Sequence, residues 1–112
     1  MNITIVPYKL PESVPTPKEE CGWIALHDNK AIGWNSLLFL SHNTVKFANA
    51  FVEKEYRGNG IYRMLWDARW KWCQENLKGY DVITYCLPTT LNFYREKGWS
   101  EGHTSTLMSS KI

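Results

Sequence analysis

Long apolar stretches are missing from this chain. The longest aliphatic and aromatic run, Leu37 to Leu40, is far shorter than the ~18 residues that a membrane-spanning helix needs. The first ten residues, MNITIVPYKL, lack the basic and apolar regions of a secretory signal. These two absences predict a soluble cytoplasmic protein with no membrane partner.

Cysteine is scarce as well. The chain has three cysteines, an odd number, and they form no CxxC pair. Such a count argues against a disulfide framework and against a zinc site. We therefore expect no bound metal, and we expect Cys21, Cys73 and Cys86 to be free, buried thiols in a reducing compartment.

An excess of charge of one sign is also absent. The 13 Lys and Arg nearly balance the 11 Asp and Glu, which gives a net charge of +2 and a pI of about 8.4. Proteins that bind nucleic acid usually have a pI above ~9 and clustered charge, so a nucleic-acid partner is disfavoured. The segment from Lys54 to Lys78 is locally basic, with six Lys or Arg against three acids, and could hold a local anion site.

Aromatic residues, by contrast, are abundant: six Trp, six Tyr and four Phe in 112 residues. The length suits one domain that buries a core without disulfides. Hydrophobic residues at 44% and charged residues at 21% are ordinary globular values. We therefore expect a single domain over residues 1–112, with large buried or ligand-facing aromatic surfaces.

The hydrophobic pattern changes its period along the chain. Short β-prone segments joined by turns predict an antiparallel meander in the first half. From Gly60 to Lys78 the apolar residues fall at helical spacing, and Gly79 is a stop signal. The predicted order is β-β-β-β-α-β-α-β, with strands at 2–10, 21–28, 31–41 and 45–53, a helix at 60–78, a strand at 81–87, a helix at 90–97 and a last strand around 104–108.

The middle of the chain predicts a right-handed βαβ crossover. Strands 45–53 and 81–87 should therefore be parallel, and the other strands antiparallel. Residues 11–20 hold three prolines and are predicted to form an extended loop. The expected fold class is α+β with α/β/α layers: a mixed, mostly antiparallel sheet with helices on both faces.

The turn between strand 45–53 and the long helix contains Arg57-Gly58-Asn59-Gly60. Two glycines here allow a sharp turn and leave amide groups unshielded by side chains. Those amides lie at the positive end of the helix dipole, which suits a phosphate or pyrophosphate, and Arg57 and Arg63 could add charge. The GxGxxG pattern of dinucleotide-binding turns and the GKS or GKT of a Walker loop are both absent.

Arg57-Gly58-Asn59-Gly60-Ile61-Tyr62 resembles the pyrophosphate loop of the GNAT N-acetyltransferase superfamily, which is Arg or Gln, two residues, Gly, one residue, then Gly or Ala. Tyr62 departs from that pattern, because the family has a small residue there. Downstream, residues 93–99 (FYREKGW) resemble the family's Tyr-x-x-x-Gly-Phe motif, and Leu87 stands where the family often has Asn. The resemblance covers about residues 20–100.

This resemblance implies a GNAT-like acyl-CoA N-acyltransferase fold and an enzyme that moves acetyl from acetyl-CoA to a primary amine by direct attack. The coenzyme pyrophosphate would bind the loop amides, and the pantetheine arm would lie between strands 45–53 and 81–87. An amide near Phe51 or Val52 would bind the acetyl oxygen, and Tyr94 would protonate the leaving thiolate. The residues implied in binding acetyl-CoA are Phe51, Val52, Arg57, Gly58, Asn59, Gly60, Ile61, Tyr62 and Arg63.

The general base is less clearly marked. Members of the family often have a Glu inside the fourth strand, whereas residues 45–52 contain no acid. Glu53 at the strand end is the candidate base, although Glu53 and Glu55 also fit solvated loop charges. His27 or His42 could act through water, or the amine could lose its proton to solvent.

Family members usually carry one or two helices between the first two strands, whereas this chain has only residues 11–20 there. A lower wall favours a bulky acceptor, such as a protein lysine or amino terminus. The alternative is a catalytically silent GNAT-fold binding or inhibitor protein that uses its Trp-rich face. A nucleic-acid strip at residues 69–72 (RWKW) is disfavoured because neighbours on a helix point in different directions. The aromatic surface would allow a homodimer without requiring one.

Overall fold

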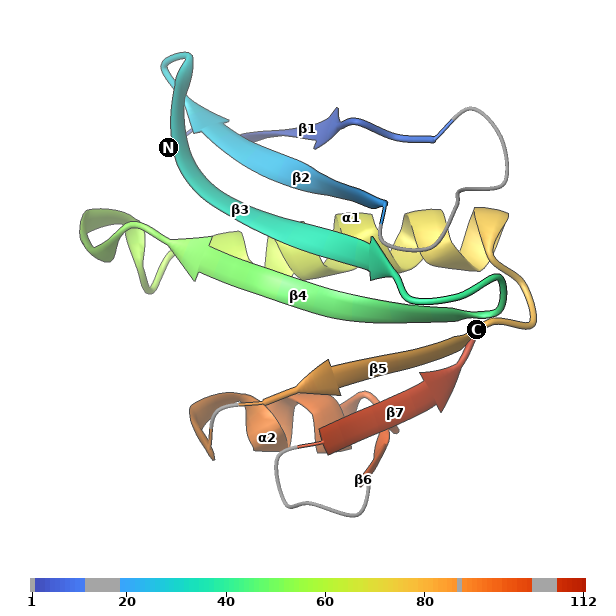
Figure 1. The fold of residues 1–112 in the computed structure, drawn as a ribbon. Helices are drawn as coiled ribbons and strands as arrows, with labels where there is room; N and C mark the ends of the chain where they lie inside the picture. The colour runs from blue at the N-terminus through green and yellow to red at the C-terminus, as the bar shows by residue number, and fades with distance from the viewer. Residues whose placement is uncertain (1, 12–18, 87, 102–106) are drawn as a thin grey trace.

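In the computed structural model, residues 2–11, 19–86, 88–101 and 107–112 are described. Within these ranges, seven strands form one sheet, in the order β1-β2-β3-β4-β5-β7-β6 (Figure 1). The strands are β1 Thr4–Tyr8, β2 Glu20–His27, β3 Lys30–Phe39, β4 Thr44–Val52, β5 Asp81–Tyr85, β6 Ser100–Glu101 and β7 Leu107–Lys111; the helices are α1 Ile61–Asn76, α2 Pro88–Glu96 and the short 3-10 helix η1 Lys54–Tyr56.

Strands β1 to β4 form an antiparallel meander, whereas β4 and β5 are parallel. Helix α1 connects β4 to β5, so the predicted βαβ crossover is confirmed. Beyond it, β7 pairs antiparallel with both β5 and β6. Pro7 lies in the edge strand β1, where a missing amide hydrogen is tolerated best.

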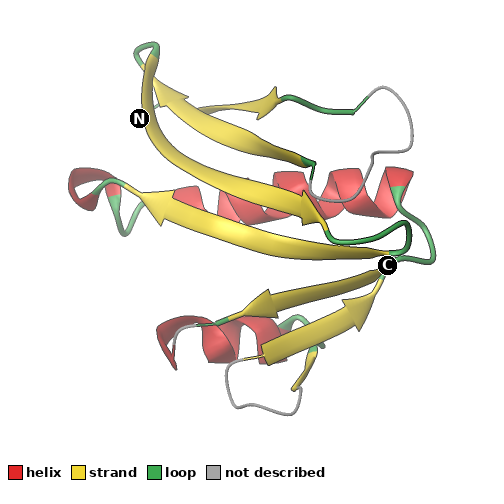
Figure 2. Ribbon diagram, viewed as in Figure 1, coloured by secondary structure: helices red, strands yellow, loops and turns green. Residues whose placement is uncertain are grey.

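Both helices lie on the same face of the sheet (Figures 1 and 2). The ring of Trp66 on α1 lies 5.3 Å from the ring of Phe93 and 6.0 Å from the ring of Tyr94 on α2. The expectation of helices on both faces is therefore wrong for the described residues. The reason is topological. Strand β6 runs parallel to β5 and lies on the side of β5 that faces away from β4. A second right-handed connection, from β5 to β6, therefore places α2 on the same face as α1.

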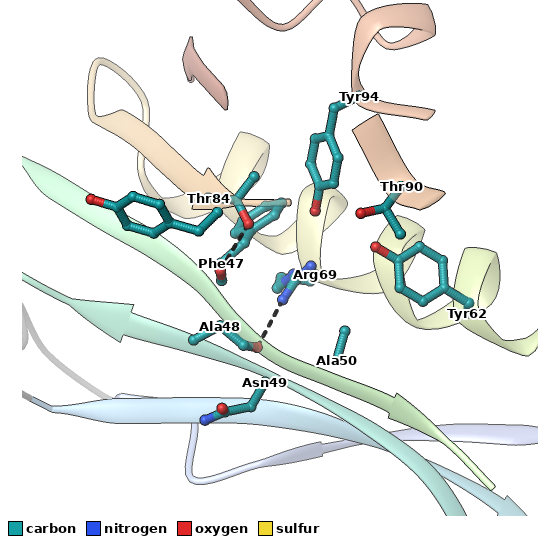
Figure 3. A pocket seen from close by; sticks show the side chains of 10 residues that line it. Phe47, Ala48, Asn49, Ala50, Tyr62, Arg69, Thr84, Thr90 and Tyr94 are labelled. Atoms are coloured by element: carbon teal, nitrogen blue, oxygen red, sulfur yellow. Dashed lines mark hydrogen bonds between the residues drawn. The ribbon is translucent and has the colours of Figure 1, made fainter. Parts of the chain in front are cut away.

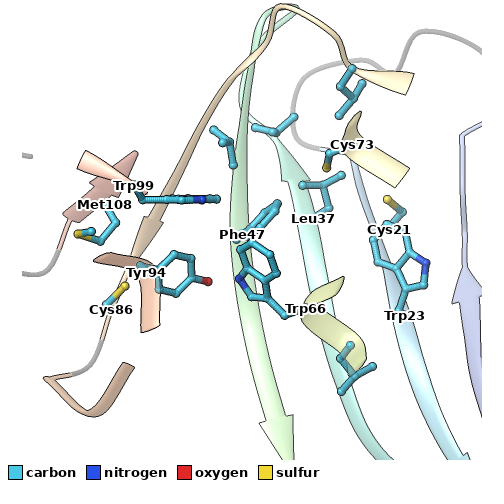
Figure 4. Packing of buried hydrophobic residues seen from close by; sticks show 14 of the residues in the cluster. Cys21, Trp23, Leu37, Phe47, Trp66, Cys73, Cys86, Tyr94, Trp99 and Met108 are labelled. Carbon is cyan, nitrogen blue, oxygen red and sulfur yellow. The ribbon is translucent and has the colours of Figure 1, made fainter. Parts of the chain in front are cut away.

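The core fills the space between the sheet and the two helices (Figure 4). Its centre is aromatic: Phe47 of β4 meets the rings of Trp66, Trp70 and Trp99 at 5.3 to 6.1 Å between centroids. Such ring pairs add to the free energy gained from burying their area. The three cysteines are buried and free, as the sequence predicts.

The predicted elements extend slightly beyond the observed ones at most ends. Strand β6 and helix η1 were not predicted, and the last strand lies at Leu107–Lys111 rather than around 104–108. Residues 12–18, most of the predicted proline-rich loop, and Leu87 lie outside the described residues. Within the described ranges, no helix is both long and apolar enough to span a bilayer.

Candidate active site

The site begins where β4 and β5 separate. Their parallel pairing ends at Phe47 and Thr84, whereas β4 continues to Val52. The Thr84 hydroxyl closes the last paired position by donating a hydrogen bond to the Phe47 carbonyl at 3.0 Å. Beyond it, β4 has one extra residue relative to β3, and Asn49 adopts the left-handed conformation with φ of 46°. This bulge bends β4 away from β5.

A cavity of about 140 Å³ lies at this separation (Figure 3). Two strands and two helices contribute its walls. The lining residues are Phe47, Ala48, Asn49 and Ala50 from β4, Tyr62 and Arg69 from α1, Thr84 and Tyr85 from β5, and Thr90 and Tyr94 from α2.

Tyr94 projects its hydroxyl into this cavity (Figure 3). Its side chain is only 3% exposed, and its ring packs edge-to-face on Trp99 at 4.8 Å. This packing follows from the sequence FYREKGW. Gly98 takes a positive φ of 85° after α2, and the Trp99 amide donates to the Tyr94 carbonyl at 3.1 Å. The chain therefore folds back, and Trp99 fixes the Tyr94 ring against the core.

The glycine loop lies at the start of α1. Gly58 and Gly60 have φ values of 83° and 77°, which side chains rarely adopt, and no described atom lies within 4 Å of a Cβ placed on either. The first hydrogen bond of α1 runs from the Met64 amide to the Gly60 carbonyl at 3.0 Å. The amides of residues 61–63 therefore have no acceptor within the helix. Open space, orphan amides and the helix dipole together suit an anion such as a pyrophosphate.

The two arginines of the loop lie against aromatic rings. Arg57 donates from Nε to the Val52 carbonyl at 2.8 Å, and its guanidinium lies 5.6 Å from the Phe51 ring centroid. It thereby joins the loop to the end of β4. Arg63 stacks over Phe93 of α2 at 5.2 Å.

The predicted residues at the end of β4 lie outside the cavity lining. Phe51 is exposed and packs on Trp34 at 4.8 Å, and Val52 pairs with Gly33. The Glu53 carboxylate is 3.7 Å from Lys30 Nζ. The lining of the cavity contains no carboxylate among the described residues.

The two predicted histidines also lie apart from the cavity. His27 contacts the Asn2 carbonyl at 3.2 Å and the ring of Tyr56, and His42 is exposed near the β3–β4 turn. Asn59 is used within the loop, where its side-chain amide donates to the Tyr56 carbonyl at 2.9 Å.

Tyr62, the departure from the family pattern, lines the cavity rather than pointing away (Figure 3). Its ring meets Phe93 edge-on at 5.7 Å. Burial raises the pKa of Tyr62, and the neighbouring Tyr94 hydroxyl raises it further. Tyr62 is therefore a neutral phenol at neutral pH.

Of the lining residues, the sequence predicted only Tyr62 and Tyr94 as site residues, and the charged one that it missed is Arg69. It is 1% exposed and lies on α1 below Tyr94 (Figure 3). A signal was present: Leu65, Arg69 and Cys73 are spaced by four, and all three are buried. An arginine within an apolar helical stripe indicates a buried charge.

A family model for the GNAT acetyltransferase domain matches residues 18–101. The chain belongs to the GNAT acetyltransferase family. Family members are acetyl-CoA-dependent acetyltransferases, so this chain is a transferase domain with acetyl-CoA as its co-substrate. The resemblance, the GNAT-like fold with its mixed sheet and the enzyme class expected from the sequence are confirmed, whereas the helix layering was wrong.

Solved structures of this family have the same fold. A GNAT acetyltransferase from Elizabethkingia anophelis with acetyl-CoA bound is 14% identical, with a TM-score of 0.74, and the match covers 99% of each chain. An IAA acetyltransferase from Bacillus cereus is 15% identical, with a TM-score of 0.73, and the match covers 99% of this chain and 100% of that one.

Some relatives are longer. PaiA N-acetyltransferase from Thermoplasma acidophilum, in complex with coenzyme A, is 18% identical with a TM-score of 0.65. The match covers 83% of this chain but only 61% of that protein. No curated protein sequence matches the chain.

Proposed function

We propose that this protein transfers the acetyl group of acetyl-CoA to a primary amine by direct attack, with Tyr94 as the general acid. One observation carries the proposal: the Tyr94 hydroxyl points into the cavity where β4 and β5 separate. A phenol held there can protonate a sulfur that leaves between the two strands.

The path proposed for acetyl-CoA follows unpaired backbone. The pyrophosphate would rest on the amides of residues 57–63, where both glycines leave open space. The pantetheine arm would then lie alongside residues 48–52, beyond the last β4–β5 pair. The amide of Val52, which follows the bulge, is the candidate donor to the acetyl oxygen. The adjacent Glu53 amide donates to the Ile32 carbonyl of β3, and successive amides of a strand point to opposite edges.

The reaction is one of addition and elimination. The amine attacks the thioester carbon, and a backbone amide stabilises the resulting oxyanion by donating a hydrogen bond to it. The C–S bond then breaks, its electron pair stays on sulfur, and Tyr94 gives sulfur a proton. Because Glu53 lies outside the cavity lining, it would accept the amine's proton through water; loss of that proton to solvent is the other route.

For the acceptor, we propose a bulky amine such as a protein lysine or amino terminus. No helix of the described ranges covers the sheet face opposite α1 and α2 (Figure 2). Trp34 and Phe51 expose 40% and 39% of their surface there, beside the cavity strand. An open wall with exposed rings is better suited to an extended chain than to a small amine enclosed on all sides.

Thermal unfolding with and without acetyl-CoA tests the binding part of this proposal. Ligand at 100 times its Kd should stabilise the protein by about 2.7 kcal/mol. Tyr94→Phe should keep that shift and lower kcat by roughly 10²- to 10⁴-fold. Tyr80→Phe is the matched control, because Tyr80 directly precedes β5, at the end of the strand away from the cavity.

Three outcomes separate the candidate functions. No shift at millimolar acetyl-CoA would contradict the proposal. A shift without release of free coenzyme A thiol from any peptide or small amine would favour the silent binding protein. Efficient acetylation of a small amine beside an untouched peptide library would refute the bulky acceptor alone.

A further inference from the structure

Arg69 is a fully buried cation at the base of the cavity. Its guanidinium carbon lies 3.8 Å from the centroid of the Phe47 ring. Its Nη1 donates to the Ser36 carbonyl at 2.8 Å and to the Ala48 carbonyl at 3.4 Å. Its Nε has no hydrogen-bond partner among the described residues. Nη1 thus anchors the guanidinium to the sheet, whereas the Nε–H group is still able to donate a hydrogen bond.

This cation has no carboxylate partner in the described part of the chain. The titratable groups that face it are the phenols of Tyr62 and Tyr94 and the thiol of Cys73. Burial raises the pKa of the Tyr62 phenol, and it raises the pKa of the Cys73 thiol to about 12. The groups from α1 are therefore neutral at neutral pH. Burying a charge without an opposite charge is costly, so the positive charge lacks a counterion until an anion forms in the cavity.

Acetyl transfer creates such an anion at this place. When Tyr94 gives its proton to the departing sulfur, a phenolate forms where the Tyr94 hydroxyl points toward Arg69 (Figure 3). A cation in contact with an acid group favours the charged form of that group.

We propose that Arg69 is a positioning residue that orients the Tyr94 hydroxyl and stabilises the phenolate it leaves. This inference rests on the proposed function, because it needs Tyr94 as the acid.

The step balances without any further reagent. The C–S bond of the tetrahedral intermediate breaks, and its electron pair goes to sulfur. The O–H bond of Tyr94 breaks, its proton forms the S–H bond, and its electron pair stays on the phenolate oxygen beside Arg69. The phenolate then takes back a proton from water, which balances the proton that the acceptor ammonium released.

A purely structural role would explain only part of this geometry. The bonds to Ser36 and Ala48 come from Nη1 alone and hold β3 and β4 beneath the helix. Such bracing predicts lost stability when Arg69 is replaced. It predicts no change in the pH dependence of the chemical step.

The test compares Arg69→Lys and Arg69→Gln with wild type, using release of coenzyme A thiol across pH. Arg95→Gln is the matched control, since Arg95 lies on α2 outside the cavity lining and bonds Asn92 at 3.1 Å. We expect kcat to fall roughly 10- to 100-fold for Arg69→Gln and less for Arg69→Lys, which keeps the charge. The KM for acetyl-CoA should change little, and the high-pH limb of kcat should move to higher pH.

A double-mutant cycle with Tyr94→Phe completes the test. Because Arg69 acts through Tyr94, adding Arg69→Gln to Tyr94→Phe should lower kcat little further. If Arg69→Gln does not fold, Arg69→Met, which also removes the charge, takes its place. Unchanged kcat and pH limb in a folded neutral variant overturn the inference while leaving the acetyl transfer intact. Wild-type protein without any turnover overturns the proposed function, and the inference with it.

Discussion

Gly60→Ala changes the conformation on which the proposed pyrophosphate site depends. Gly60 is the residue before α1 and has φ of 77°, and no described atom lies within 4 Å of an added Cβ. The methyl group therefore meets no steric clash, and the cost is that of holding Ala in the left-handed region, about 1–2 kcal/mol. For a domain of this size we expect Tm to fall by roughly 4–8 °C per kcal/mol.

The same change should weaken binding of acetyl-CoA. The added methyl group takes up part of the open space at the start of α1, and any shift of the Gly60 backbone misaligns the orphan amides that follow it. Loss of one hydrogen bond to a charged phosphate costs about 1.5–3 kcal/mol. The expected rise in Kd is roughly 10- to 150-fold, measured by calorimetric titration with acetyl-CoA below the Tm of the variant.

Gly79→Ala provides the matched control. Gly79 follows α1 at its other end, has φ of 89°, and likewise has no described atom within 4 Å of an added Cβ. It should cost the same stability and leave the Kd unchanged. Equal Kd values for the two variants would refute the placement of the pyrophosphate on the loop. Unchanged stability in both would refute the backbone argument itself.

Two further predictions concern the sheet and the thiols. Gly22→Ala should lower the free energy of unfolding by about 1–3 kcal/mol, because an added Cβ would collide with the carbonyl oxygen of Asn35; an unchanged denaturation midpoint in urea would contradict this. Burial raises the pKa of Cys21 and of Cys73 to about 12, so both thiols should resist alkylation at pH 8 in the native protein and react once it unfolds. Thiols in the unfolded chain ionise near pH 9. These two groups therefore contribute stability that is fully present below pH 9 and is lost between about pH 9 and 12. Urea midpoints that stay constant over this range would contradict the assignment.

The sequence was most informative where a local rule decides the structure. Side-chain periodicity is a local property, so it predicted the meander and the long helix. Handedness added the parallel pairing of β4 and β5. The loop glycines and the Gly98–Trp99 turn need positive φ, which few residues other than Gly adopt easily, and the structure has positive φ at Gly58, Gly60 and Gly98. Roles in binding at residues 57–63 stay predictions.

Features that depend on contacts between distant parts of the chain could not be predicted from the sequence. The face covered by α2 depends on where β6 joins the sheet, and β6 has only two residues. The orientation of Tyr62 depends on Phe93, which is 31 positions away in the sequence. The same holds for Glu53, whose carboxylate lies against Lys30 rather than in the cavity.

The sequence by itself thus determined the elements, the crossover and the glycine loop, because spacing and backbone conformation are local. The tertiary structure decided the cavity. It opens because a bulge at Asn49 separates β4 from β5, and it contains a buried cation because the apolar stripe of α1 carries Arg69 beneath Tyr94. Whether a charge is buried depends on the surface packed against it, and for Arg69 that surface comes from β3, β4 and α2.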